Sequence, residues 1–202
     1  EKARAAGPGM REGEGLTMNI NDTIQMIEEG RMDRLLTELY GEEKLAESRG
    51  RCRMVLEGYR DTFGDSEDVL LFSSPGRTEI SGNHTDHNHG KVLAGSINLD
   101  CLGVAAKNAS CKVRIVSETY KQDFTIDLNH LEPSPKKAGT TDLVKGILKG
   151  FEESGCAVGG FNTYVTSNVI SAAGVSSSAS FEMLLCSMLN VFFNEGRMDT
   201  VA

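Results

Sequence analysis

Hydrophobic residues recur at helical spacing through the first part of the chain. Between about residues 20 and 63 the apolar positions lie three or four residues apart, as on one face of an α-helix, and the clearest row is Met32, Leu35, Leu36 and Leu39. Gly41 follows this row and predicts the end of that helix, and a further helix is expected at about 43–59. This part of the chain is therefore predicted to be helical and amphipathic.

The pattern changes at Val69, where short runs rich in β-branched and aromatic residues begin. These runs predict strands at 69–72, 91–97, 100–106, 112–117, 123–128 and 162–170. Helical spacing returns at about 141–154, where Gly155 ends the helix, and at about 177–194. Strands that come first and helices that follow are typical of the α+β class, so we expect a mixed or largely antiparallel sheet.

Composition divides the chain into three parts. Residues 1–17 are rich in glycine, alanine and charge, and they are expected to form a disordered tail. Residues 18–67 are expected to form a helical N-terminal extension that packs without a chemical role, and residues 68–202 form the main domain. The chain stops soon after a helix of the buried type, so we expect a truncated fragment.

Charge and cysteine content narrow the class of protein. With 202 residues, 39% of them hydrophobic and 25% charged, the chain has the composition of a globular protein. Its net charge of −8 argues against nonspecific nucleic-acid binding, which needs a basic surface, and no apolar run approaches the roughly 18 residues of a membrane span. The five cysteines are odd in number and scattered, which favours reduced thiols in the cytoplasm.

A dense polar segment, residues 75–90, interrupts the strand-like runs. It contains Arg77, Asp86, a glutamate, two asparagines and three histidines, and so many buried polar groups would each need a partner. The segment therefore predicts a functional site. Two alternatives remain open: it could be an exposed polar loop, or zinc or iron could be ligated by His84, Asp86, His87 and His89.

A second candidate segment, residues 171–179, lies between the last predicted strand and the last predicted helix. Its small residues let the backbone approach a ligand, and the helix start that follows presents unpaired N–H groups and partial positive charge. Such a helix start binds anions, and phosphate is the usual one. Plain N-capping is the alternative, but it needs one serine where Ser176, Ser177 and Ser178 stand in a row. The segment has no Walker A pattern.

Together the two segments resemble those of a known family. Residues 76–90 are similar to the galactokinase motif G-R-x-N-x-x-G-E-H-T-D-Y-N-x-G, and residues 174–179 are similar to the P-x-x-x-G-L-S-S-S-A loop of the wider GHMP kinases. The likeness covers about residues 68–195. It implies the GHMP kinase N-terminal domain, a ribosomal protein S5 domain 2-like fold in which helices cover one face of a mostly antiparallel sheet. The family's C-terminal domain is expected to be missing.

The resemblance implies a role for each matching residue. Arg77 is expected to stabilise charge on the reacting sugar oxygen and on the transferred phosphoryl group. The sugar-binding positions are matched by Asn83, His84, Thr85 and Asp86. The phosphate-binding loop is matched by Ala172, Ala173, Gly174, Val175, Ser176, Ser177 and Ser178, of which Ser178 also matches the serine that contacts Mg²⁺. The implied cofactors are ATP and Mg²⁺.

The implied activity is that of a galactokinase-type sugar kinase, which uses ATP to phosphorylate the anomeric hydroxyl of galactose. The chain departs from the family motif at Glu79, Asn83 and His87, where the family has Asn, Glu and Tyr. Two alternatives therefore stay open: a kinase for N-acetylgalactosamine or another sugar, and a sensor that binds galactose and ATP without turnover. We expect a monomer without nucleic-acid or membrane partners. The family's catalytic aspartate and a Mg²⁺-binding glutamate are expected downstream of residue 202, so these residues alone should be inactive.

Overall fold

The computed structural model describes residues 4–6, 18–66, 68–82, 91–133, 139–169 and 176–198. Its helices are α1 (Ile20–Glu28), α2 (Asp33–Tyr40), α3 (Leu45–Phe63), α4 (Thr140–Glu153) and α5 (Ser177–Phe193), with a 3-10 turn, η1 (Glu42–Lys44), before α3. Its strands are β1 (Arg4–Ala6), β2 (Leu70–Ser81), β3 (Leu93–Lys107), β4 (Lys112–Ser117), β5 (Gln122–Asp127) and β6 (Phe161–Ser167). Of the helices described, none is both long and apolar enough to cross a lipid bilayer.

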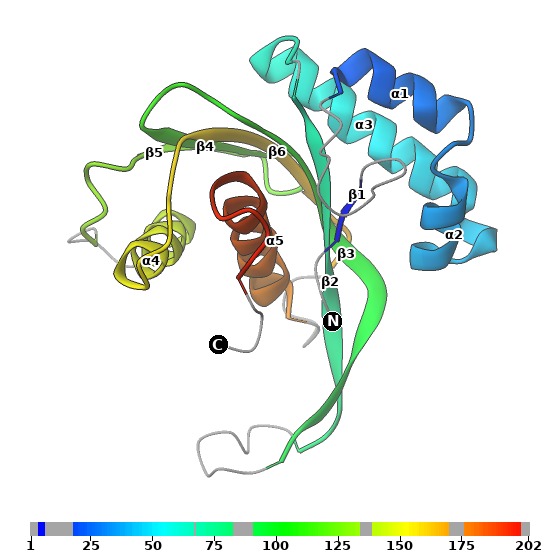
Figure 1. Ribbon diagram of the computed structural model, residues 1–202. Coiled ribbons are helices and arrows are strands. Elements are labelled where there is room, and N and C mark those ends of the chain that lie inside the picture. The colour runs from blue at the N-terminus through cyan, green and yellow to red at the C-terminus, as the bar shows by residue number, and fades with distance from the viewer. Residues whose placement is uncertain are drawn as a thin grey trace.

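The strands form one mixed sheet in the order β1-β2-β3-β6-β4-β5. Among the described strands, β4 and β6 run parallel, whereas the other neighbouring strands run antiparallel. The α+β class and the largely antiparallel sheet predicted from the sequence are therefore confirmed. β2 and β3 form a long hairpin whose far end extends beyond the rest of the sheet (Figure 1).

Helices cover both faces of this sheet (Figure 1). Successive residues of β3 point to opposite sides, so Leu102 and Val104 pack with α1–α3, whereas Cys101 and Ala105 pack with α4 and α5. The helices α4 and α5 are the layer that the resemblance predicted on one face. The N-terminal helices bury the other face, and the division of the chain at residue 68 into extension and main domain stays a prediction.

Most predicted elements lie where the sequence placed them. The strand predicted at 112–117 is β4, and the helices predicted at 141–154 and 177–194 correspond to α4 and α5. Gly41 and Gly155 follow α2 and α4 with φ of 90° and 74°, as expected for glycines that end helices.

The long hairpin differs from the prediction. The strands predicted at 91–97 and 100–106 form one strand, β3, and the strand predicted at 69–72 continues to Ser81 as β2. Pro75 and Asp100 are residue types that usually interrupt strands. Here these two residues pair with each other, and a register shift between Pro75 and Arg77 absorbs the irregularity within the hairpin.

The N-terminal tail also contains one structured segment. Arg4–Ala6 forms the three-residue strand β1, which pairs with β2, and this differs from the disorder expected at these residues. The rest of residues 1–17 lie outside the described part of the chain.

Candidate functional site

The start of α5 is fixed to strand β2 of the sheet. Ser180, in the first turn of α5, is buried and donates a hydrogen bond from Oγ to the carbonyl oxygen of Ser74 on β2 at 2.7 Å. The first backbone N–H groups of a helix have no partner within it, and the aligned peptide dipoles add partial positive charge there. The fold thus holds an anion-attracting helix end against β2.

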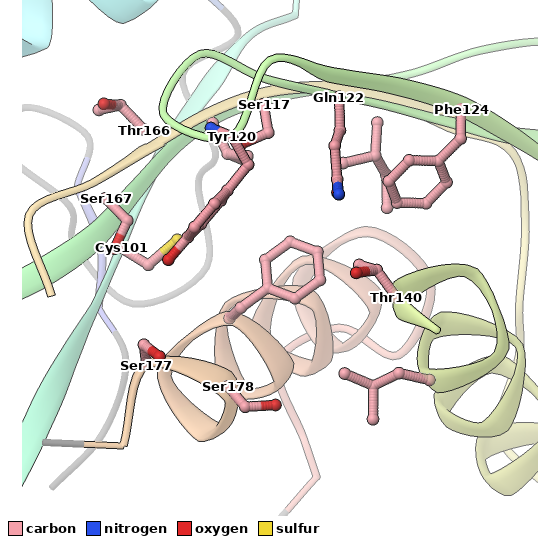
Figure 2. A pocket seen from close by; sticks show the side chains of 14 residues that line it. Cys101, Ser117, Tyr120, Gln122, Phe124, Thr140, Thr166, Ser167, Ser177 and Ser178 are labelled. Carbon is pink, nitrogen blue, oxygen red and sulfur yellow. The ribbon is translucent and has the colours of Figure 1, made fainter. Parts of the chain in front are cut away.

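A cavity of about 210 Å³ opens beside this helix end (Figure 2). Its wall comes from the four strands β3 to β6, from the β4–β5 turn and from the first turns of α4 and α5. The polar lining consists of Ser117, Tyr120, Gln122, Thr140, Thr166, Ser167, Ser177 and Ser178, and the apolar lining of Cys101, Ile115, Phe124, Leu143, Val165 and Phe181. An apolar pocket with a few converging polar groups is typical of a ligand site.

Two helix N-termini meet at this cavity. Thr140 is the first residue of α4 and Ser177 is the first residue of α5, and both line the cavity (Figure 2). The cavity is smaller than the roughly 300–1,000 Å³ of pockets that enclose a whole ligand, so it suits one part of a larger molecule. A ligand with a flat part inside the cavity and an anionic part at the start of α5 would match both features.

The cavity has side chains suited to a flat heterocycle. Tyr120 reaches into it from the β4–β5 turn and Gln122 from the start of β5 (Figure 2), and the amide of Gln122 can both donate and accept hydrogen bonds. Burial raises the pKa of Cys101 to about 12, so this thiol stays neutral and adds to the apolar wall.

Sequence reasoning missed most of the cavity residues. Tyr120, Gln122 and Phe124 belong to no local motif, because the fold gathers the lining from separate strands and helices. A usable signal was present at Thr140, since it directly precedes the helix predicted at 141–154 and therefore lies at a helix start, where backbone N–H groups are unpaired.

Three residues of the predicted phosphate loop are described. Ser176 occupies the N-cap position of α5 with φ 60° and ψ 48°, and Ser177 and Ser178 line the cavity. The hydroxyl of Ser178 donates a hydrogen bond to Oε1 of Glu182 at 2.9 Å. The oxygen atoms of these two side chains fit Mg²⁺ as ligands, because Mg²⁺ prefers oxygen. The other predicted loop residues, Ala172, Ala173, Gly174 and Val175, lie outside the described residues.

Arg77 lies on β2, further along the strand from Ser74, which contacts α5. Its guanidinium is about half exposed and pairs with the carboxylate of Glu79 at 3.4 Å. The predicted sugar-binding residues, Asn83, His84, Thr85 and Asp86, lie outside the described residues, and so do His87 and His89 of the metal alternative. In the part of the chain that is described, no group of three or more His, Cys, Asp or Glu is placed to hold a metal.

Comparison with known sequences identifies close similarity to one enzyme family. The model of the galactokinase galactose-binding signature matches residues 57–107, which include β2 and β3. The galactokinase of Clostridium tetani is 35% identical over 130 residues, which cover 64% of this chain and 33% of that protein. The galactokinase of Lactococcus lactis subsp. lactis is 34% identical over 141 residues, which cover 68% of this chain and 35% of that protein.

Solved structures agree with the sequence comparison. The crystal structure of Lactococcus lactis galactokinase complexed with galactose matches with a TM-score of 0.66 and 30% identity, over 74% of this chain and 39% of that chain. A mevalonate kinase shares the fold, with a TM-score of 0.51, 16% identity, and coverage of 61% of this chain and 40% of that chain. The chain spans about a third of the length of the curated relatives it matches. By signature, sequence and fold, this chain is similar to one part of the galactokinases.

Proposed function

We propose that this chain is part of a galactokinase-type sugar kinase, which transfers the γ-phosphoryl group of ATP to the anomeric hydroxyl of galactose. One juxtaposition carries the proposal. The galactose-binding signature spans β2 and β3, and the bond between Ser180 and Ser74 holds the serine-rich start of α5 against β2. Phosphoryl transfer needs its donor and acceptor sites side by side, because positioning supplies much of the catalysis.

ATP is proposed to bind with its base in the cavity and its phosphates at the start of α5. Tyr120 offers a flat face and Gln122 an amide for the base, while the N–H groups of the first turn hold phosphate oxygens. Mg²⁺ would be held through Ser178, beside Glu182, and when bound it neutralises charge on the phosphate oxygens.

Arg77 is proposed to stabilise the negative charge that develops during transfer, and residues 83–86 to hold the sugar hydroxyls. In the structure the guanidinium of Arg77 is paired with Glu79, so it must share or leave this partner when it contacts a phosphoryl oxygen. Glu79 therefore sets how strongly the charge of Arg77 is available to the substrate.

The proposal is tested by measuring ADP release from the complete protein with ATP, Mg²⁺ and a panel of sugars. We expect turnover with galactose and little with glucose. Faster turnover with N-acetylgalactosamine would favour a kinase for that sugar. The presence of Asn83 in place of the family's Glu supports this alternative. Calorimetric binding of galactose and ATP without ADP release would favour a sensor, and the absence of both binding and turnover would refute all three.

The role of Arg77 is tested with Arg77→Ala in the complete protein. We expect kcat to fall roughly a thousandfold, as when a charge-stabilising arginine is lost from a phosphoryl-transfer site, with a much smaller rise in the sugar KM. Arg114→Ala is the matched control, because Arg114 is also partly exposed and pairs with a carboxylate, that of Asp123, at 2.8 Å. Equal turnover of the parent and Arg77→Ala would rule out this role.

We further propose a cytoplasmic location and a monomeric state. All five cysteines are free thiols, which supports a reducing compartment. Sedimentation of the complete protein checks the monomer.

A further inference from the structure

Asp100 is buried between the sheet and the N-terminal helices. Its side chain is 3% exposed, and its carboxylate accepts three hydrogen bonds: Oδ2 from the hydroxyls of Tyr40 and Ser73, each at 2.6 Å, and Oδ1 from Nη1 of Arg51 at 2.8 Å. The donors belong to α2, β2 and α3. These partners are needed because a charge removed from water is costly unless it is paired and hydrogen-bonded.

The backbone of Asp100 is bound to Asn168. Its N–H donates to Oδ1 of Asn168 at 2.7 Å, and its carbonyl oxygen accepts from the N–H of Asn168 at 3.2 Å. Asn168 directly follows β6, and the chain leads from there to the serine-rich start of α5. On its other side Asp100 pairs with Pro75, at the register shift that precedes Arg77. The junction of β2, β3 and β6 at Asp100 thus lies between Arg77 and the serine-rich start of α5, the two parts of the candidate site.

We propose that Asp100 is a positioning residue. Through its hydrogen bonds to Tyr40 and Arg51, the N-terminal helices hold the junction of β2, β3 and β6 in place. Arg77 lies beyond this junction on one side, and the start of α5 lies beyond it on the other. The neighbouring Cys101 faces the cavity, whereas the side chain of Asp100 is bonded to the helices on the opposite face. The inference rests on the proposed function for its effect on turnover. The hydrogen bonds at the junction can be measured without any substrate.

Packing alone does not require a charge at this position. Leu102 and Val104, on the same face of β3, are apolar and fully buried, and an apolar residue would fill the space without the cost of desolvation. Three donors around one carboxylate instead fix its direction, and a buried hydrogen-bond network of this kind makes the surrounding structure rigid, even though Nη2 of Arg51 is buried without a hydrogen-bond partner among the described residues. Loss of one donor should therefore loosen the junction before it unfolds the protein.

The test compares Tyr40→Phe with Tyr164→Phe in the complete protein. Each change removes one tyrosine hydroxyl that donates to a carboxylate at 2.6 Å, that of Asp100 in the first and that of Glu118 in the second. Both tyrosines belong to the core beneath the N-terminal helices. In the absence of substrate, we expect amide hydrogen exchange at Asp100 and Asn168 to become about tenfold faster in Tyr40→Phe and to stay unchanged in Tyr164→Phe.

Turnover is the second readout. In Tyr40→Phe and in Asp100→Asn we expect kcat to fall about tenfold, with the sugar KM within about twofold of the parent. If Asp100→Asn does not fold, Tyr40→Phe decides alone. The inference fails if exchange at Asp100 and Asn168 is the same in both tyrosine variants, or if it rises in Tyr40→Phe while kcat is unchanged. A protein without kinase activity would contradict the proposed function instead, and the exchange measurement would then decide the inference.

Discussion

Ser176 holds a backbone conformation that costs free energy. Its φ of 60° and ψ of 48° are left-handed, and at the N-cap of α5 its side chain makes no capping hydrogen bond. A residue with a Cβ pays roughly 1 kcal/mol for this conformation. Backbone strain of this kind persists mainly where function requires it, so it supports a role for Ser176 in ligand binding rather than in helix capping.

Ser176→Gly is expected to raise stability and to weaken ATP binding. Glycine adopts positive φ at little cost, so the free energy of unfolding should rise by up to about 1 kcal/mol. Loss of the hydroxyl that we propose contacts phosphate should lower the affinity for MgATP on the order of tenfold. Thermal unfolding and calorimetry measure the two effects. Glu195→Gly is the control, because Glu195 has φ 54° at the other end of α5 and should gain stability without a change in affinity. Unchanged MgATP affinity in Ser176→Gly would leave the strain without a binding role.

The sequence indicated candidate site residues only where they belong to a local motif. Arg77 and the serines at 176–178 stand in such motifs, so they could be predicted without the fold. Gln122 and Asp100 could not, because a polar residue in a strand has the same local pattern whether it is exposed or buried. The partner of Asp100 on α2, Tyr40, is 60 positions away, and only the fold brings the two together.

At the scale of single elements, α3 comes close to the sheet at a glycine. A Cβ at Gly58 would lie 2.5 Å from ring atoms of Tyr164 on β6, which is closer than real contacts allow. The ring cannot easily move away, because its hydroxyl donates to Glu118 at 2.6 Å. Gly50 lies in the same helix with no atom within 4 Å of its added Cβ, so the two positions differ in packing rather than in helix propensity.

Substitution of these two glycines by alanine should have opposite effects. Gly58→Ala is expected to lower the free energy of unfolding by about 1–2 kcal/mol, because overpacking outweighs the gain in helix propensity. Gly50→Ala should raise it by about 1 kcal/mol, because only the propensity changes. Urea unfolding of both variants measures the difference. Similar shifts in the same direction would mean that α3 does not pack this closely on β6.

Elements with one buried face were the ones that the sequence predicted well. α4 and β4 show clear periodicity, because one side of each is buried in the core and the other side is more exposed. The second half of β3 is buried on both sides, since helices cover both faces of the sheet, and its pattern does not alternate. The insertion of β6 between β3 and β4 depends on contacts far apart in sequence, which a local pattern cannot supply.

At the scale of the whole molecule, the sheet joins two cores into one body. One core lies between the sheet and α4–α5, the other lies between the sheet and α1–α3, and β3 contributes to both. Each core contains a buried thiol, Cys101 in the first and Cys52 in the second. Burial raises the pKa of both thiols to about 12. Burial, together with the carboxylate of Asp100, also raises the pKa of Tyr40 well above its usual value.

These groups predict that the free energy of unfolding falls as pH rises above about 9. The ordinary thiol pKa is 9.0, so between pH 9 and 12 the cysteines of the unfolded chain lose their protons while Cys52 and Cys101 keep theirs. The unfolded state is then favoured increasingly with pH, by at most about 1.4 kcal/mol per pH unit for each thiol. Below pH 9 both states hold the proton, and these groups have no effect on stability.

Urea unfolding between pH 8 and 11 measures this slope. Cys101→Ala and Cys52→Ala should each flatten the decline, whereas Cys111→Ala, which removes an exposed thiol, should leave it as in the parent. Because the two cores share β3, both effects should appear in one cooperative transition. Two separate transitions, each sensitive to one of these cysteines, would instead mean that the N-terminal helices unfold independently of the sheet. They could not then hold the Asp100 junction in place.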